Sequence, residues 1–236
     1  MIRAEKTSLR YGRELPLEVR RNPRALYVSL RVDAASDHPV LILPRGVPLS
    51  EGLAFARAKR DWLALRYAAL PPKVPFADGA LILVEGQPHL VRHRRGWRGT
   101  VRRALGASGR VLEVGGQEEH LPRRLADWFK AEARRLIARA VADKALEIGR
   151  WPTRITLRDT SSRWGSCSPE GRLSFSWRLV MAPAHVLDYV VAHEVAHLVH
   201  LNHGRAFWKL VEALAKNQPG ARSWLQQHGS ALLRFG

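Results

Sequence analysis

The chain has 236 residues and a formal net charge of +18. It contains no run of about 18 apolar residues, which argues against a membrane-spanning helix, and residues 1–6 lack the apolar core of a signal peptide. A single cysteine, Cys167, excludes an internal disulfide. We therefore expect a cytoplasmic protein of one large or two small domains, with no membrane partner and a basic surface that favours nucleic acid or acidic proteins.

The first part of the sequence predicts β-structure with one helix. Residues 15–19 and 26–32 are strand candidates, and residues 40–43 follow a turn as the hairpin partner of the second. Ser50 is typical of an N-cap, and it precedes a predicted helix over residues 51–69. That helix would place four apolar side chains against the sheet: Leu53, Trp62, Leu63 and Leu70.

A second β segment covers residues 80–114, and a long amphipathic helix over residues 121–148 follows it. The basic loop at residues 94–98 carries Trp97, which could stack on a base. His89 and His93 lack neighbouring cysteines or carboxylates, so we do not expect them to bind metal. We place a β-rich N-terminal region at residues 1–118 and a catalytic domain at residues 119–236.

A histidine pair marks the stretch from residue 186 to residue 200. His193, Glu194 and His197 form the pattern H-E-x-x-H within an apolar segment that predicts a helix. Residues i and i+4 of a helix project from one face, so both imidazoles can reach one metal ion. Glu194 lies beside them and can take a proton from a metal-bound water. The pattern predicts a zinc site with a third protein ligand and an open position for water.

Three residues can supply the third ligand. His203 follows the expected helix end, marked by Gly204, where the chain can fold back to the metal. Glu212, on the next predicted helix, would be the ligand in a glutamate-type zinc protease. His200 shares the helix face but lies about 10.5 Å along the axis from His193, too far for bonds of about 2.1 Å. We favour His203, then Glu212, then His200.

Two strands are predicted before the histidine helix. Residues 155–158 form one, and residues 173–179 form the other, with one buried and one polar face. We expect the second strand to pair its backbone with an extended peptide. The polar segment between them contains Arg163, a candidate for contact with the substrate or an oxyanion, and Cys167, which we interpret as a structural thiol.

Four short motifs resemble one known family in their order and spacing. They are R-W-G-S-C-S at residues 163–168, H-E-V-A-H-L at 193–198, N-H-G at 202–204 and F-W at 207–208. Together they resemble the YgjP-like metal-dependent hydrolases, which are related to SprT-like and WLM-type zinc metallopeptidases. The resemblance implies an α+β fold, with a β-rich N-terminal part before a compact zincin-like core. It also implies Zn²⁺ bound by His193, His197 and His203, with Glu194 as general base.

These features favour a zinc-dependent metallopeptidase that hydrolyses a protein or peptide substrate with a metal-activated water. Two alternatives stay open. One is a zinc hydrolase of a non-peptide amide or ester. The other is a nucleic-acid-associated protein with a structural metal site, which a closed four-ligand arrangement would favour.

Overall fold

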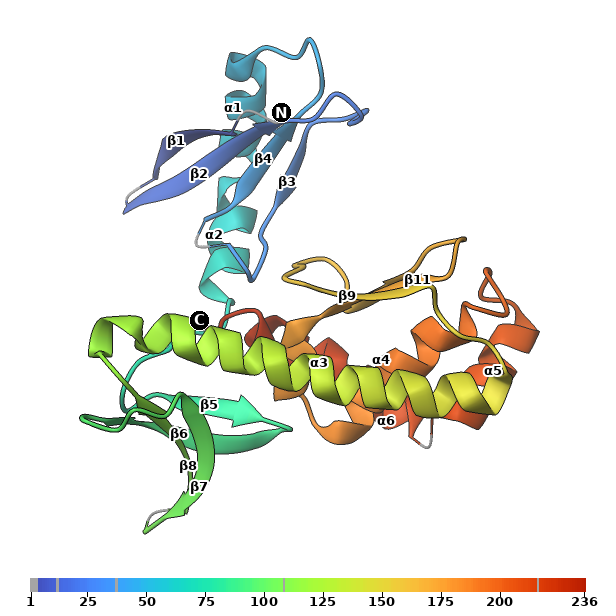
Figure 1. The fold of residues 1–236 in the computed structure, drawn as a ribbon. Coiled ribbons are helices and arrows are strands. Elements are labelled where there is room, and N and C mark those ends of the chain that lie inside the picture. The colour runs from blue at the N-terminus through green and yellow to red at the C-terminus, as the bar shows by residue number, and fades with distance from the viewer. Residues whose placement is uncertain (1–3, 12, 37, 108, 216) are drawn as a thin grey trace. The chain divides into compact units, whose positions relative to one another are not determined.

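The structure, a computed structural model, describes residues 4–11, 13–36, 38–107, 109–215 and 217–236. Its contacts divide the chain into two compact units, Met1–Pro72 and Lys73–Gly236, and each has its own apolar core. The α+β class is confirmed (Figure 1). The domain boundary expected after residue 118 falls inside the second unit, because Val84 and Leu112 of the second β segment share one core with Leu125 and Phe129 of the long helix.

The first unit is a four-stranded sheet with two helices. Its elements are β1 (Ala4–Tyr11), β2 (Arg13–Arg21), β3 (Ser29–Arg31), β4 (Val40–Leu43), α1 (Leu49–Ala58) and α2 (Arg60–Ala68). The strands lie in the order β1-β2-β4-β3, and β3 and β4 are antiparallel, as the predicted hairpin requires.

At Gly52, α1 approaches β4 so closely that a Cβ on this glycine would lie 2.3 Å from the Leu43 side chain. β1 was not predicted, because its sequence has too little apolar alternation.

The helix predicted over residues 51–69 is interrupted. α1 begins directly after Pro48, so Ser50 lies within the first turn and is not the N-cap. Lys59 has φ −102° and ψ 15°, which departs from helical geometry and separates α1 from α2. The predicted packing of Trp62 against the sheet is wrong, because the residue is 43% exposed.

The strand predicted over residues 26–32 is also shorter, since only the three residues of β3 are extended and paired. Asn22 begins a turn in which its side chain and its carbonyl both accept backbone hydrogen bonds. Leu26 and Tyr27 follow this turn and are largely exposed. The prediction used only the alternation of apolar residues and did not take into account that asparagine favours turns.

The second unit begins with a four-stranded sheet that packs on a long helix. Its strands are β5 (Leu81–Val84), β6 (Gln87–Arg94), β7 (Val101–Gly106) and β8 (Gly109–Gly115), in the order β5-β6-β8-β7. The short 3₁₀ helix η1 (Glu118–His120) leads into α3 (Leu121–Ile148). α3 has the predicted bounds and ends at Gly149 in the left-handed conformation. Among the described residues, no helix is long and apolar enough to cross a membrane.

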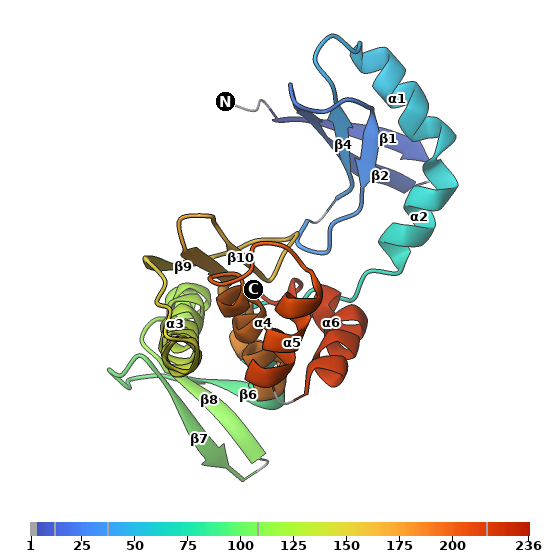
Figure 2. The same ribbon diagram turned by 90° about the vertical axis from the view of Figure 1, so that its right-hand side faces the viewer.

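A three-stranded sheet and three helices complete the second unit. The strands are β9 (Arg154–Arg158), β10 (Gly165–Cys167) and β11 (Arg172–Ser176), in the order β10-β11-β9. The 3₁₀ helix η2 (Trp177–Met181) and the helices α4 (Ala184–Ala196), α5 (Arg205–Leu214) and α6 (Gln218–Leu232) follow. Both ribbon views show α3 between the two sheets of this unit (Figures 1 and 2).

The strand predicted over residues 173–179 ends early. Ser176 accepts a hydrogen bond from the backbone N–H of Arg178 and caps η2, so the chain leaves the sheet there. Apolar residues are buried both before and after Ser176, including Leu173, Phe175 and Leu179. The inner face of the sheet therefore packs on the helices, and β10 lies beside α4.

Candidate metal centre

The histidine helix ends at the second histidine of the motif. α4 stops at Ala196, and His197 is its C-cap. Backbone N–H groups of Leu198 and His200 bond to the last turn, and the following loop returns His203 to the start of α5. The chain therefore folds back onto the helix face that carries His193.

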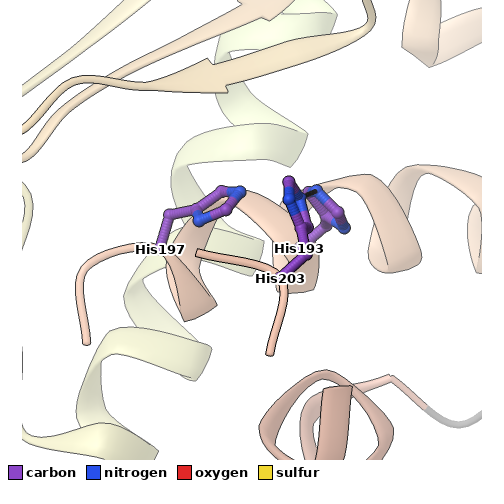
Figure 3. A group of neighbouring side chains, drawn as sticks. All are labelled: His193, His197 and His203. Carbon is purple, nitrogen blue, oxygen red and sulfur yellow. Dashed lines mark hydrogen bonds between the residues drawn. The ribbon is translucent and has the colours of Figure 1, made fainter. Parts of the chain in front are cut away.

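Three imidazoles meet at this point (Figure 3). His193, His197 and His203 each offer one ligand nitrogen, and these nitrogens all lie within 4.8 Å of one another. Nε2 of His193 is 3.1 Å from Nε2 of His203. Two nitrogens bound to one tetrahedral ion at 2.0–2.1 Å would be roughly 3.4 Å apart. The observed spacing fits a single metal ion.

The protonation states of His193 and His197 also fit a metal. Burial lowers the pKa of His193 to about 4, with smaller contributions from His197 and His203. Burial also lowers the pKa of His197, so neutral imidazoles are favoured, as ligation requires. Nδ1 of His197 donates to the carbonyl of His200 at 2.9 Å, which leaves its Nε2 lone pair free for a metal. Nδ1 of His193 is buried and has no hydrogen-bond partner among the described residues.

Aromatic side chains form the wall behind the histidines. The ring of Phe207 lies 4.9 Å, 4.5 Å and 4.7 Å from the rings of His193, His197 and His203. Phe207 is fully buried, and Trp208 lies 5.7 Å from His193 and from His203. This wall restricts the imidazole rotamers and keeps solvent from one side of the site.

Glu194 lies next to the histidines but is not one of the group. Its side chain is buried and packs directly against Gly165 of β10. Burial raises the pKa of Glu194 to about 7, and the charge of Arg163 opposes this rise. A carboxyl group in this state can take up and release a proton near neutral pH.

The other metal-ligand candidates lie outside the group. Among the described residues, only the three histidines above bring their ligand atoms together in this way, so neither Glu212 nor His200 joins them. His89 and His93 each bond to a backbone carbonyl, of Gln87 and Gly116 respectively. Both bonds are structural.

Cys167 lies in β10, on the same sheet face as Gly165. Burial raises the pKa of its thiol to about 11, with a smaller contribution from the charge of Glu194. Its Sγ donates to the carbonyl of Ser168 at 3.3 Å. The nucleophilic thiolate is therefore strongly disfavoured at neutral pH.

The strand expected to pair with a substrate was misassigned. β11 lies between β10 and β9, so both of its edges are occupied. β10 is an edge strand, and the carbonyl of Trp164 and the N–H of Ser168 bond toward β11. In an antiparallel pair, the backbone N–H and C=O groups of successive residues point alternately toward and away from the partner strand. The backbone groups of Gly165 and Cys167 therefore point away from β11, to the unpaired edge of β10.

Three residues near the site were not predicted. Gly165 occurs within a motif that was recognised, but its contact with Glu194 has no sequence signal. The ring of Tyr189 lies 6.1 Å from that of His193, one turn earlier on α4, so helical spacing could have indicated it. The guanidinium of Arg222 lies over Trp208 and contributes to lowering the pKa of His193. Arg222 is far from the histidine motif in the sequence, so no local pattern indicated that it lies near the site.

The basic loop at residues 94–98 has intramolecular partners. Arg94 lies 3.6 Å from Glu113, and Arg95 lies 3.5 Å from Glu118. The guanidinium of Arg102 lies 4.9 Å from the Trp97 ring. The Trp97 side chain, which we expected to be able to stack on a base, therefore stacks on Arg102 within the protein.

One comparison with known proteins gave a match. The family model described as "YgjP-like, metallopeptidase domain" matches residues 26–228, which is most of the chain. Neither the comparison with curated proteins nor the comparison with solved structures found a match.

Proposed function

Because the chain belongs to the YgjP-like metallopeptidase family, we propose that it is a zinc-dependent peptidase. In this proposal His193, His197 and His203 bind the ion, and Glu194 is the general base. The observation that carries the proposal is the position of Glu194, which follows His193 on α4, is buried, and packs against Gly165 of the edge strand β10.

Zinc is the metal that the donor set favours. Three neutral imidazoles suit Zn²⁺ better than Mg²⁺ or Ca²⁺, which prefer oxygen ligands. Three protein ligands are also the number found in catalytic zinc sites. When bound, zinc supplies a Lewis acid that polarises a carbonyl oxygen and lowers the pKa of water toward about 7.

Glu194 moves the proton. Since burial raises its pKa to about 7, the carboxylate can accept a proton from the attacking water and then donate it to the leaving amine. Arg163 acts on this carboxylate by its charge. We assign to Arg163 a second role, which is to stabilise negative charge on the carbonyl oxygen of the substrate.

β10 positions the peptide. Its free-edge groups, on Gly165 and Cys167, can pair with an extended substrate by strand addition. Gly165 is also the residue that touches Glu194, so a paired peptide would present its backbone beside the general base. Such pairing favours a peptide over a small amide or ester, and the absence of a fourth side-chain ligand among the described residues argues against a closed structural metal site.

The test is the substitution Glu194→Gln, which keeps the size of the side chain and removes the base. Zinc content and melting temperature should be retained, while peptide cleavage should fall on the order of 10²- to 10⁴-fold. His200→Ala is the control, because it removes a neighbouring imidazole and keeps the backbone carbonyl that accepts from His197. Wild-type turnover in Glu194→Gln with normal zinc content would reject the proposal.

A further inference from the structure

The outer face of the β9–β11 sheet is polar. Thr156, Ser174 and Ser166 are register partners across the three strands, so their side chains share one face. The neighbouring positions Leu173 and Phe175 point to the opposite face and are buried. Thr156 donates to the carbonyl of Leu173, whereas the hydroxyls of Ser166 and Ser174 have no side-chain hydrogen bond among the described residues.

Four arginines surround this row of hydroxyls. They line one groove of about 660 Å³ together with it, and all are exposed: Arg154, Arg158, Arg163 and Arg172. Within the part of the chain that the structure describes, none of them forms an ion pair with a carboxylate. Asp159, which follows Arg158, is paired with Arg178 at 2.8 Å, and Glu170 accepts a hydrogen bond from the Ser168 hydroxyl at 2.7 Å. Two carboxyl groups interact with these arginines only through charge, Glu170 with Arg172 and Glu194 with Arg163.

Two of these arginines oppose each other directly. Arg172 of β11 and Arg154 of β9 are register partners in a parallel pair, and two like charges on neighbouring strands repel each other. The sheet therefore carries an unfavourable pair beside free hydroxyl donors. Local features that oppose stability are expected where a ligand compensates for them, and a bound anion would do so here.

We propose that this groove, which we call the arginine groove, binds acidic side chains of the peptide substrate. The proposal rests on the proposed function, because it requires an extended peptide paired with β10. Alternate side chains of such a peptide lie on the same face as Ser166. The substrate class is therefore a protein segment with Asp or Glu at alternate positions.

The reach of the side chains supports this arrangement. Neighbouring strands are about 4.8 Å apart, so Arg172 lies about two strand spacings, roughly 10 Å, from a peptide paired with β10. Arginine and glutamate side chains together span that distance and form bidentate, charge-assisted hydrogen bonds. Arg154 lies one strand farther away, and it contributes through its charge.

A single-stranded nucleic acid fits the groove less well. Binding of such strands depends on exposed aromatic side chains that stack on bases. The aromatic residues of this groove are Phe175, which is buried, and Trp164, whose ring contacts Gly229 of α6. The groove offers cations and hydroxyl donors without a free stacking surface.

The experiment measures binding to the full-length Glu194→Gln variant, so that the peptide is not cleaved. The probes are a fluorescent peptide in which Glu alternates with Thr, and the same peptide with Gln in place of Glu. We expect the Glu peptide to bind at least about tenfold more tightly. Arg154→Gln/Arg172→Gln should abolish this difference, and Arg172→Gln alone should weaken binding more than Arg154→Gln alone. Arg163 stays unchanged because its charge acts on Glu194.

The matched control is Arg134→Gln/Arg139→Gln, which removes two exposed arginines of α3 outside the groove. It should retain the preference for Glu. Equal binding of both peptides, or an equal loss in the control, would overturn the proposal and leave only general attraction to a chain of net charge +18. Tighter binding of a labelled oligothymidylate, lost in Arg154→Gln/Arg172→Gln, would overturn it in favour of a phosphate backbone.

Cleavage by the wild-type chain separates the two proposals. Peptide cleavage that depends on Glu194 but shows no preference for acidic residues would leave the peptidase proposal standing and overturn the arginine groove. Cleavage that is unchanged in Glu194→Gln would overturn the catalytic proposal, and the binding comparison would still decide the role of the groove.

Discussion

Gly165 lies directly against the side chain of Glu194. A Cβ placed on Gly165 would be 2.5 Å from Cγ and 2.6 Å from Oε1 of Glu194, closer than real Cβ contacts. Gly165 has two roles. Its backbone belongs to the free edge of β10, and its lack of a side chain leaves room for the Glu194 carboxylate. The pairing of the R-W-G-S-C-S motif with the H-E-x-x-H helix thus has a steric basis.

The first prediction concerns Gly165→Ala. The added methyl group should displace the Glu194 carboxylate, and a displacement of about 1 Å can lower turnover about 10²-fold. Zinc content should stay normal, because the methyl group points at Glu194 and not at the histidines. Turnover, zinc content and melting temperature measured on one preparation would test this. Wild-type turnover at an unchanged melting temperature would show that the contact does not position the base.

The second prediction concerns the third metal ligand. His203→Ala should lose most of the bound zinc, because only His203 among the described residues completes the group with His193 and His197. His200→Ala and Glu212→Ala should retain it. Metal analysis of the three purified variants after dialysis checks this, and full zinc occupancy in His203→Ala would place the ligand elsewhere.

Periodicity and local chemistry made much of the second unit predictable. The bounds of α3 follow from its apolar spacing and from Gly149. The β5–β6 hairpin lies in the predicted second β segment, and its return strand begins at Gln87, inside the turn that the sequence suggests at residues 85–88. The convergence of the three histidines was also expected, because H-E-x-x-H fixes two on one helix face and Gly204 marks a nearby turn. These features depend on short-range sequence.

Features that depend on contacts between distant segments were not predictable. The edge position of β10 is set by the parallel pairing of β11 with β9, which leaves no signal in either strand. Arg222 reaches the site only because α6 packs near Trp208. The contact-based division after Pro72 differs from the predicted boundary after residue 118 for the same reason, since the second β segment packs on α3 in one core.

The third prediction concerns Glu18 in the first unit. Its carboxylate is buried and accepts from Nε of Arg20 at 2.5 Å and from Nε2 of His38 at 2.8 Å. The hydrogen bond from Arg20 lowers the pKa of Glu18, against the effect of burial. Because the folded pKa is below the unfolded value of about 4.3, the stabilisation is complete above that value and is lost as the pH falls through the folded pKa.

Glu18→Gln should therefore weaken the first unit by about 1–2 kcal/mol at neutral pH, and the difference from wild type should shrink below about pH 4. Hydrogen–deuterium exchange of β2 and β4 peptides, compared at each pH, would measure this. Glu51→Gln, an exposed acid of α1 in the same unit, should have little effect. A difference that persists in acid would contradict the ionic origin of the stabilisation.

The last prediction concerns Lys144, a buried cation that joins the helices of the metal site. Its Nζ lies 2.6 Å from Oδ1 of Asp188 on α4 and donates to the carbonyl of Leu214, at the end of α5, at 2.7 Å. Asp188→Ala would leave a buried ammonium with one carbonyl partner. Since Asp188 is partly exposed, we expect a loss of about 1–3 kcal/mol, less than for a fully buried pair.

Lys144→Met in the Asp188→Ala background should restore part of this stability, because it removes the unpaired charge and keeps much of the buried volume. The melting temperature of the double variant should therefore exceed that of Asp188→Ala, by about 2–4 °C for each kcal/mol recovered. Zinc content should be the same in both, since neither residue contacts the histidines. A double variant less stable than Asp188→Ala would mean that the bond from Lys144 to the Leu214 carbonyl, rather than the ion pair, holds α5 against α3.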